Sequence, residues 1–155
     1  MLGYYLDPEA TAEACPDGWF RTGDVAVMYP DHYVEIRDRR KDVIISGGEN
    51  ISSVEIEATL VSHPSVAEAA VVSMPDLKWG ERPIAWVTLK SGHTATAEEL
   101  QRHVRQRLAA FKVPDRIEFA ELLKTASGKV QKFELRARAR AAGPATRVER
   151  RDEHA

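Results

Sequence analysis

The spacing of apolar and polar residues predicts a series of helices and strands that begins near residue 52. Ser52 and Glu55 form a capping box, which predicts a helix over residues 53–62. The apolar residues of this segment form two stripes at helical spacing, so we expect the helix to be buried on two sides. One stripe holds Ile56 and Leu60, and the other holds Val54, Ala58 and Val61.

Three later segments have the length and composition of strands. Residues 66–74 are nearly all apolar and predict a buried strand, and residues 82–90 and 116–121 predict two more. Side chains alternate across a strand, so the two faces of the second segment can be assigned. One face holds Ile84, Trp86 and Thr88, and the other holds Ala85, Val87 and Leu89.

Two further helices are expected, one on each side of the last strand. Thr96 and Glu99 form a second capping box, followed by a stripe at i, i+4 spacing that holds Leu100, Val104 and Leu108. The final helix is expected over residues 129–141, with Lys132 on its surface. Its inward positions are expected to be Val130, Phe133 and Ala137.

The first forty residues contain many turn formers and only two short strand-like runs, 25–29 and 32–36. Two strands bury too little apolar surface to be stable alone in water. A polar, highly charged stretch over residues 37–42 then leads to the short apolar run 43–45 and the polar segment 46–50. We therefore expect a linker near residue 40, and we interpret the part before it as the tail of a larger domain.

Composition excludes several classes of protein. The chain has 155 residues, of which 43% are hydrophobic and 30% charged, as in an ordinary globular protein. Its net charge of −2 gives no electrostatic drive toward nucleic acid, and no apolar run is long enough to span a membrane. The single cysteine, Cys15, cannot form an intramolecular disulfide and fits a cytoplasmic location, and the histidines show no metal-ligand spacing.

Four motifs occur in a fixed order along the chain. They are Gly18-Trp19-Phe20-Arg21-Thr22-Gly23-Asp24, Asp38-Arg39-Arg40-Lys41-Asp42, Ser46-Gly47-Gly48-Glu49-Asn50 and Lys124-Thr125-Ala126-Ser127-Gly128-Lys129. In this order and spacing they closely resemble the C-terminal part of the adenylate-forming enzymes, the superfamily of acyl-CoA synthetases, adenylation domains and luciferases. The fatty or medium-chain acyl-CoA synthetases are the most similar branch.

The resemblance implies an α+β fold: a small C-terminal lid domain with a short antiparallel or mixed sheet flanked by helices. Residues 1–38 would be a two-stranded remnant of the large AMP-binding domain, 39–139 the mobile C-terminal domain, and 140–155 a basic flexible tail. It also implies two half-reactions. A carboxylate reacts with ATP to form an acyl-adenylate, and after the small domain swings about a hinge, coenzyme A displaces AMP.

The resemblance assigns roles to residues near the linker and in the last motif. Asp24 would accept hydrogen bonds from the ribose hydroxyls, and Arg39 would contact the nucleotide through its planar donor fork. Lys41 would be the hinge residue. Lys129 would carry the ammonium that neutralises charge developing between the carboxylate and the α-phosphate. Taken singly, each of these residues is as well explained by an ordinary turn, a solvated linker or a surface lysine.

The same resemblance places Gly47 and Gly48 in the tunnel for the pantetheine arm of coenzyme A, where a side chain would block the passage. Trp79, Phe111 and Lys112 match positions that contact coenzyme A in some relatives. From the residues alone, Gly47-Gly48 could be a plain turn and Phe111 could be the end of the Leu100 stripe. No residue is assigned to a metal.

We therefore expect the C-terminal part of an ATP-dependent acid–thiol ligase, inactive without its large domain. Its cosubstrates would be ATP and coenzyme A, with Mg²⁺ held mainly by the large domain. A carboxylic acid would be the substrate, and no nucleic acid or membrane would be a partner. Two alternatives stay open: a stand-alone module that binds nucleotides or a partner protein, and a lid domain whose thiol acceptor is a carrier protein.

Overall fold

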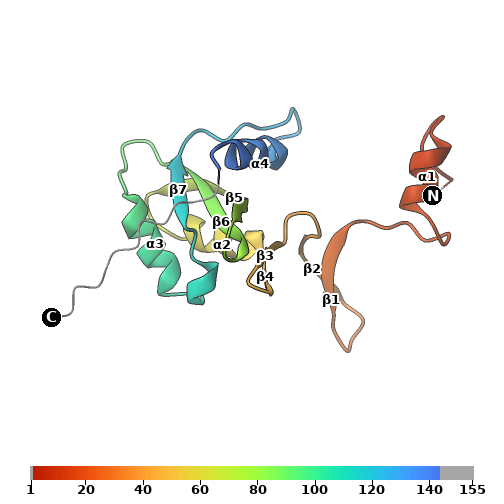
Figure 1. Ribbon diagram of the computed structural model, residues 1–155, viewed down its shortest axis with the longest axis horizontal. Coiled ribbons are helices and arrows are strands. Elements are labelled where there is room, and N and C mark those ends of the chain that lie inside the picture. Colours follow the sequence, from red (N-terminus) through yellow and green to blue (C-terminus); the bar gives the residue numbers. More distant parts are fainter. Residues whose placement is uncertain (1, 144–155) are drawn as a thin grey trace. The chain divides into compact units, whose positions relative to one another are not determined.

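The computed structural model describes residues 2–143, and this part of the chain divides into two units, one ending at Lys41 and the other beginning at Asp42. The elements are labelled in Figure 1. In chain order they are α1 (Pro8–Ala14), β1 (Asp24–Met28), β2 (Val34–Arg39), β3 (Ile44–Ser46), β4 (Glu49–Ile51), α2 (Ser53–Val61), β5 (Val66–Asp76), β6 (Gly80–Leu89), α3 (Ala97–Arg105), the 3₁₀ turn η1 (Ala110–Lys112), β7 (Arg116–Phe119) and α4 (Lys132–Ala141). The expected tail lies mainly outside the described residues.

The first unit holds α1 and the antiparallel hairpin β1–β2. The hairpin agrees with the two strands expected there, but α1 was missed. Asp7 caps this helix through a hydrogen bond from the amide of Ala10 to its Oδ1 at 2.9 Å, and Pro8 is the first helical residue. Asp7-Pro8, which is one of the turn-forming pairs in the first forty residues, therefore starts a helix. The helix buries no residue, so no apolar stripe marked it.

The second unit is built on a mixed five-stranded sheet with β6 at its centre. β5 pairs antiparallel along almost the whole length of β6, and β7 pairs parallel on its other side, from Ile84 to Val87. β3 and β4 form a hairpin that joins β6 through one residue pair, Ser46 with Gly80. This arrangement confirms the expected α+β fold with a mixed sheet.

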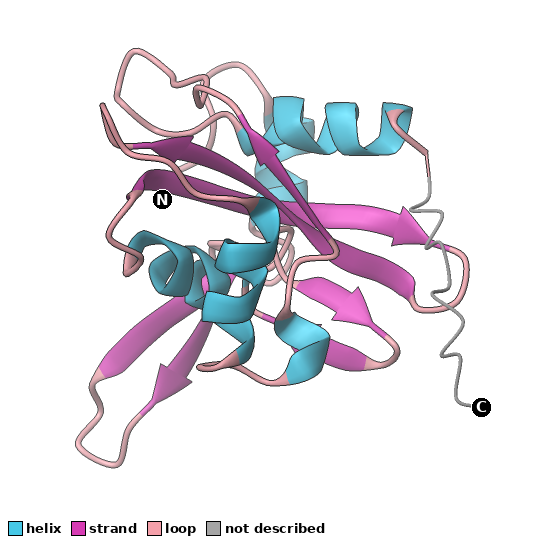
Figure 2. Ribbon diagram, turned by 90° about the vertical axis from the view of Figure 1, so that its left-hand side faces the viewer, coloured by secondary structure: helices cyan, strands magenta, loops and turns pink. Residues whose placement is uncertain are grey.

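Helices cover both faces of this sheet (Figure 2). α2 and α3 pack on one face, where they bury Ile56 and Leu60 and then Leu100 and Val104. α4 packs on the other face with Leu135 and Ala139, against a cluster that includes Ala70, Val72, Met74, Ile84 and Trp86. The alternation predicted for β6 is confirmed, because its two sets of side chains enter two different cores.

Two predictions about helix faces were wrong. In α2 only the stripe of Ile56 and Leu60 is buried, whereas Val54 and Val61 are exposed, because a single sheet face lies against this helix. α4 begins at Lys132 instead of residue 129, which places Leu135 and Ala139 inward. Phe133 is exposed and so is Ala137, whereas Val130 lies before the helix and packs against the core from a β-bridge.

Candidate functional site

Lys129 lies near the end of a short exposed hairpin loop. The isolated bridge between Lys124 and Val130 closes the loop, and the amide of Thr125 donates to the carbonyl of Lys129 at 2.8 Å. The amide of Lys129 donates in turn to Thr125 Oγ1 at 3.2 Å. The backbone of Lys129 is thus fixed from both sides. Its ammonium makes no hydrogen bond or ion pair within residues 2–143, so it can reach a ligand.

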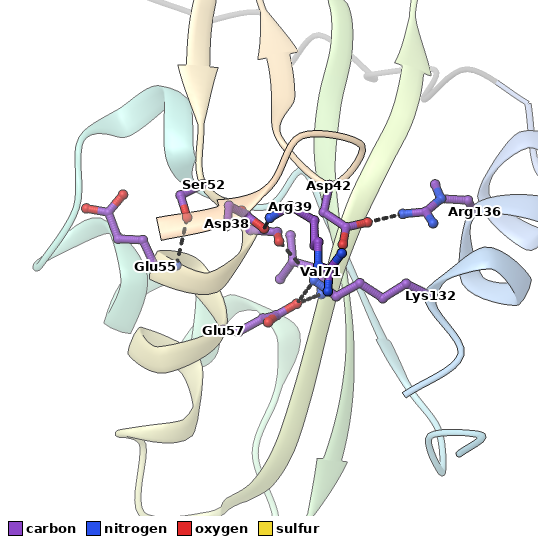
Figure 3. A network of polar contacts seen from close by, with 10 residues as sticks. Asp38, Arg39, Asp42, Ser52, Glu55, Glu57, Val71, Lys132 and Arg136 are labelled. Atoms are coloured by element: carbon purple, nitrogen blue, oxygen red, sulfur yellow. Dashed lines mark hydrogen bonds and ion pairs between the residues drawn. The ribbon is translucent and has the colours of Figure 1, made fainter. Parts of the chain in front are cut away.

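The chain that follows Lys129 is anchored where α4 begins (Figure 3). Lys132 Nζ lies 2.7 Å from Glu57 Oε1 and donates to Ser53 Oγ at 2.9 Å. Glu57 Oε1 also accepts the amide of Val71 at 2.7 Å. Lys132 therefore links α4 to α2 and β5 and is largely buried, which corrects the expectation that it would be a surface residue.

Asp24 and Arg39 are brought together across the β1–β2 hairpin, where they are register partners. Arg39 Nε lies 2.8 Å from Asp24 Oδ1, and Arg39 Nη1 donates to the carbonyl of Thr22 at 3.2 Å. The Asp24 side chain is mostly covered, with 18% of its surface exposed, whereas that of Arg39 is 56% exposed. A carboxylate acceptor and a guanidinium donor thus stand side by side, as recognition of a sugar hydroxyl and an adjacent phosphate requires.

Lys41 is exposed and is the last residue of the first unit. The next residue, Asp42, forms an ion pair with Arg136 of α4 (Figure 3). The side chains of this pair are only 10% and 17% exposed. The second unit therefore begins on a fixed point immediately after the predicted hinge residue.

Gly47 and Gly48 are the two central residues of the β3–β4 hairpin, and both have positive φ, +59° and +87°. Positive φ at both positions is the requirement of a type I′ turn. The Trp79 ring lies on Gly47, and a Cβ there would be 2.7 Å from Trp79 Cε3. A Cβ on Gly48 would meet no atom within 4 Å. The Gly47-Gly48 pair thus forms a tight hairpin turn, and Gly47 is also in close contact with the Trp79 ring.

Phe111 and Lys112 belong to η1 and have partners within the domain. Phe111 is partly buried and packs against the core that lies under α2 and α3. Lys112 Nζ is 2.5 Å from Glu55 Oε2, and both side chains are partly exposed.

Arg82 binds Asp115 with two hydrogen bonds, which raise the pKa of the guanidinium above its usual value. Asp115 therefore has a structural partner on β6.

Two further features concern clusters of possible metal ligands and long apolar helices among residues 2–143. Residues 2–143 contain no group of three His, Cys, Asp or Glu side chains placed to hold a metal ion. No described helix has both the length and the apolar character needed to cross a bilayer.

Comparison with known proteins gives the family. Residues 55–129 match the AMP-binding enzyme C-terminal domain. The chain is 57% identical over 150 residues to 2-methylpropanoate–CoA ligase CCL4 of Humulus lupulus, which is 94% of this chain and 27% of that protein. It is 50% identical over 152 residues to the peroxisomal acetate/butyrate–CoA ligase AAE7 of Arabidopsis thaliana, which is 95% of this chain and 27% of that protein. The chain belongs to the AMP-binding enzyme C-terminal domain family.

Solved structures agree with this placement in the AMP-binding enzyme C-terminal domain family. MatB from Rhodopseudomonas palustris, solved with ATP bound, has a TM-score of 0.81 at 36% identity over 88% of this chain and 27% of MatB. The anthranilate–CoA ligase AuaEII, solved with anthranoyl-AMP, has a TM-score of 0.82 at 36% identity over 91% of this chain and 28% of that protein. The chain thus spans about a quarter of the length of these relatives.

Sequence reasoning missed the polar residues that hold the Lys129 loop in place. Ser53 and Glu57 are four residues apart on α2, and Lys132 and Arg136 are four residues apart on α4. Such spacing indicates that each pair shares a helix face, which is the only signal in the sequence. The contacts of Lys132 with Ser53 and Glu57, and of Arg136 with Asp42, depend on how the two helices pack on the sheet. Helical spacing does not predict them.

Proposed function

We propose that this chain is the C-terminal part of an ATP-dependent acid–thiol ligase, and that its mobile domain, residues 39–139, supplies Lys129 to the formation of the acyl-adenylate. The observation that carries this proposal is the state of Lys129. Its backbone is held by Thr125 in a closed hairpin, whereas its ammonium is exposed and meets no partner within the described residues. The motif order and the CoA ligases among the relatives support the same function.

In the adenylation step, a carboxylate oxygen attacks the α-phosphorus of ATP and pyrophosphate leaves. Negative charge accumulates on the oxygens that surround the reacting phosphorus, and the Lys129 ammonium neutralises it. Asp24 accepts hydrogen bonds from the ribose hydroxyls, while Arg39, beside it, faces the nucleotide with its exposed donors. Both roles use the arrangement of these two residues across the β1–β2 hairpin.

In the second step, rotation at Lys41 replaces the Lys129 loop at the reaction centre with the β3–β4 hairpin. The thiol of coenzyme A then attacks the acyl carbonyl, a C–S bond forms, and the C–O bond to AMP breaks. Gly47 and Gly48 leave the passage for the pantetheine arm without side chains, and Trp79 forms its wall. Phe111 and Lys112 lie on η1 as further contacts for coenzyme A.

The substrate class that we propose is an aliphatic carboxylic acid, with coenzyme A as the thiol acceptor. Resemblance to the fatty and medium-chain branch supports it, and so do the relatives, whose names give 2-methylpropanoate, acetate and butyrate as their acids. The large domain of the complete ligase would select the acid and hold Mg²⁺. A cytoplasmic location belongs to the same proposal and rests on the single cysteine.

A hybrid ligase tests the role of Lys129. This chain replaces the corresponding part of the Humulus lupulus ligase, and pyrophosphate release measures adenylation. Lys129→Ala should slow adenylation about 100- to 1000-fold. Conversion of supplied acyl-adenylate to thioester should stay unchanged. Lys90→Ala, which removes another exposed lysine after β6, is the control. Equal adenylation rates in the two variants would refute the assignment.

A second candidate function is nucleotide binding by the chain alone. The Asp24–Arg39 pair favours it, because both predicted nucleotide contacts are already assembled within the first unit. Calorimetry with AMP and the intact chain distinguishes the two functions. Binding that Asp24→Asn abolishes would support the stand-alone module, and no heat of binding would leave the ligase domain as the better account.

A further inference from the structure

We infer that Lys132 is a positioning residue for Lys129: the Glu57–Lys132–Ser53 cluster fixes the end of the Lys129 loop and thereby sets where the ammonium points. This inference rests on the function proposed above. It adds a role for a residue that touches neither substrate nor nucleotide. The cluster consists of one ammonium, one carboxylate and one hydroxyl, drawn from α2 and α4.

The other contacts of the loop are backbone bonds, one amide side chain and one apolar residue at its end. Within residues 124–131 the backbone is held by the hairpin bonds, by the amide of Gln131, which donates to the carbonyl of Leu123 at 2.9 Å, and by Gln131 Nε2, which donates to the carbonyl of Lys124 at 2.9 Å. The residues from Lys124 to Lys129 are exposed, and only Val130, which follows them, packs against the core. The Lys124–Glu68 ion pair at the start of the loop has both side chains about 40% exposed. Exposed pairs of this kind hold geometry weakly.

The Lys132 pair is different because it is shielded from water. Lys132 and Glu57 each have 18% of the side chain exposed. The Glu57 carboxylate is itself oriented by the amide of Val71 on β5. Screening is weak at such a site, so the ammonium is held in one geometry. Lys132 is only three residues from Lys129, so a fixed Lys132 restricts the position of the backbone at the end of the loop.

α4 has a second buried ion pair, which lies next to the predicted hinge residue in the chain (Figure 3). Arg136 lies one turn after Lys132 and pairs with Asp42, which follows Lys41 in the chain. Between these polar ties, Leu135 is buried against the sheet. The helix is therefore held at its first turn, at its middle and on its apolar face. A rotation at the hinge would therefore move Lys129 together with the domain, and the loop would not move independently of it.

The chemistry explains why such a constraint matters. Neutralisation of charge in a transition state depends on the placement of the cation, and a displacement of about 1 Å can reduce a rate about 100-fold. An ammonium on a flexible side chain in an exposed loop has many orientations available. Anchoring the backbone three residues away removes the largest of these motions.

The hybrid ligase tests the inference through Lys132→Met, with Lys132→Arg as the conservative variant and Arg116→Met as the control. Arg116 also forms an ion pair, with Glu118, but that pair is exposed, and both of its residues lie on β7 and not in the loop. We expect Lys132→Met to lower kcat for adenylation about 10- to 100-fold with KM for ATP within about twofold. Thioester formation from supplied acyl-adenylate should be unchanged, and Lys132→Arg should recover most of the adenylation rate.

A second arm separates positioning from general loss of structure. In a Lys129→Ala background, Lys132→Met should cause no further loss of adenylation, because the group that it positions is gone. An additional loss there, a loss shared equally by both half-reactions, or an unchanged adenylation rate in the single variant would overturn the inference. If Lys129→Ala itself does not slow adenylation, the proposed function fails instead.

Hydrogen exchange of the intact chain gives a measurement that needs no activity. Lys132→Met should increase exchange of the amides of Thr125, Lys129 and Gln131 about tenfold or more, while the amides of β5 and β6 keep their protection. Unchanged exchange in the loop would overturn the inference even if adenylation were slowed. An increase that includes the sheet would mark general destabilisation and would overturn it as well.

Discussion

Replacing Gly47 by alanine should destabilise the second unit more than the same change at Gly48, although the two glycines are neighbours in one turn. Both have positive φ, so an alanine costs about 1–2 kcal/mol at either position. Only at Gly47 does the new Cβ meet a neighbour, at 2.7 Å from Trp79 Cε3 and 3.1 Å from Cζ3. Contacts this short force the ring to move.

The position of the Trp79 ring determines the additional cost. The backbone carbonyl of Trp79 accepts the amide of Gly47 at 2.9 Å, and the amide of Trp79 donates to Asp76 Oδ1 at 2.7 Å. The backbone cannot retreat without breaking these bonds, so the Trp79 ring, whose residue is 43% exposed, must move toward solvent. Overpacking of a well-packed core costs about 1–3 kcal/mol, and a partly exposed ring places this contact at the lower end, about 1 kcal/mol. We therefore expect losses of about 2–3 kcal/mol for Gly47→Ala and about 1–2 kcal/mol for Gly48→Ala.

Urea unfolding of the intact chain, followed by far-ultraviolet circular dichroism, measures both losses. Combining each glycine variant with Trp79→Ala completes the design, because removing the ring should erase the difference between the two positions. If the difference persists without the ring, or if the two single variants unfold alike, the contact with Trp79 does not limit side-chain size at Gly47.

Two further predictions concern the second unit. Leu60→Ala should lower the free energy of unfolding by about 2–5 kcal/mol because Leu60 is fully buried, whereas Val61→Ala next to it should change it by about 0.5 kcal/mol or less; urea titration compares them. Burial lowers the pKa of His103 below its ordinary 6.5, so the unfolded chain takes up the proton first as the pH falls. Stability should therefore decline below about pH 6.5, and His103→Gln should remove that part of the decline. A slope unchanged by the substitution would contradict this.

The starts of α2 and α3 were predicted correctly because their capping signals are local, whereas the starts of α1 and α4 were not. The Ser52 and Thr96 side chains accept the amides of Glu55 and Glu99, which is the bond expected from an N-cap residue. The β4 strand was not predicted because two glycines flanked by Ser46 and Glu49 are typical of a loop before a helix, although a glycine pair is also typical of a two-residue hairpin.

The face of α4 could not be read correctly from spacing. Val130, Phe133 and Ala137 fit one stripe, and Leu135 with Ala139 fit another, so the pattern alone allowed either. The structure selects the second stripe because it shares a core cluster with Trp86 on β6 and with Leu122 in the segment after β7.

The polar contacts around the candidate site depend even less on local pattern. Lys132 and Glu57 are 75 positions apart, and Arg136 and Asp42 are 94 apart. Residue types and order pointed to Lys129 through resemblance to a family. They gave no indication of what holds its loop.

The order in which the elements occur along the chain has a consequence for biosynthesis. β6 receives β5 on one edge at once, because the two are joined by a turn, but its other edge is completed only when β7 has been made. The side of the sheet that bears Ile84 and Trp86 waits longer still, until α4 arrives. A nascent chain therefore exposes an apolar, incompletely covered sheet face until α4 has emerged from the ribosome. A chain that terminates before α4 would expose this face permanently, and we expect it to bind chaperones or to aggregate.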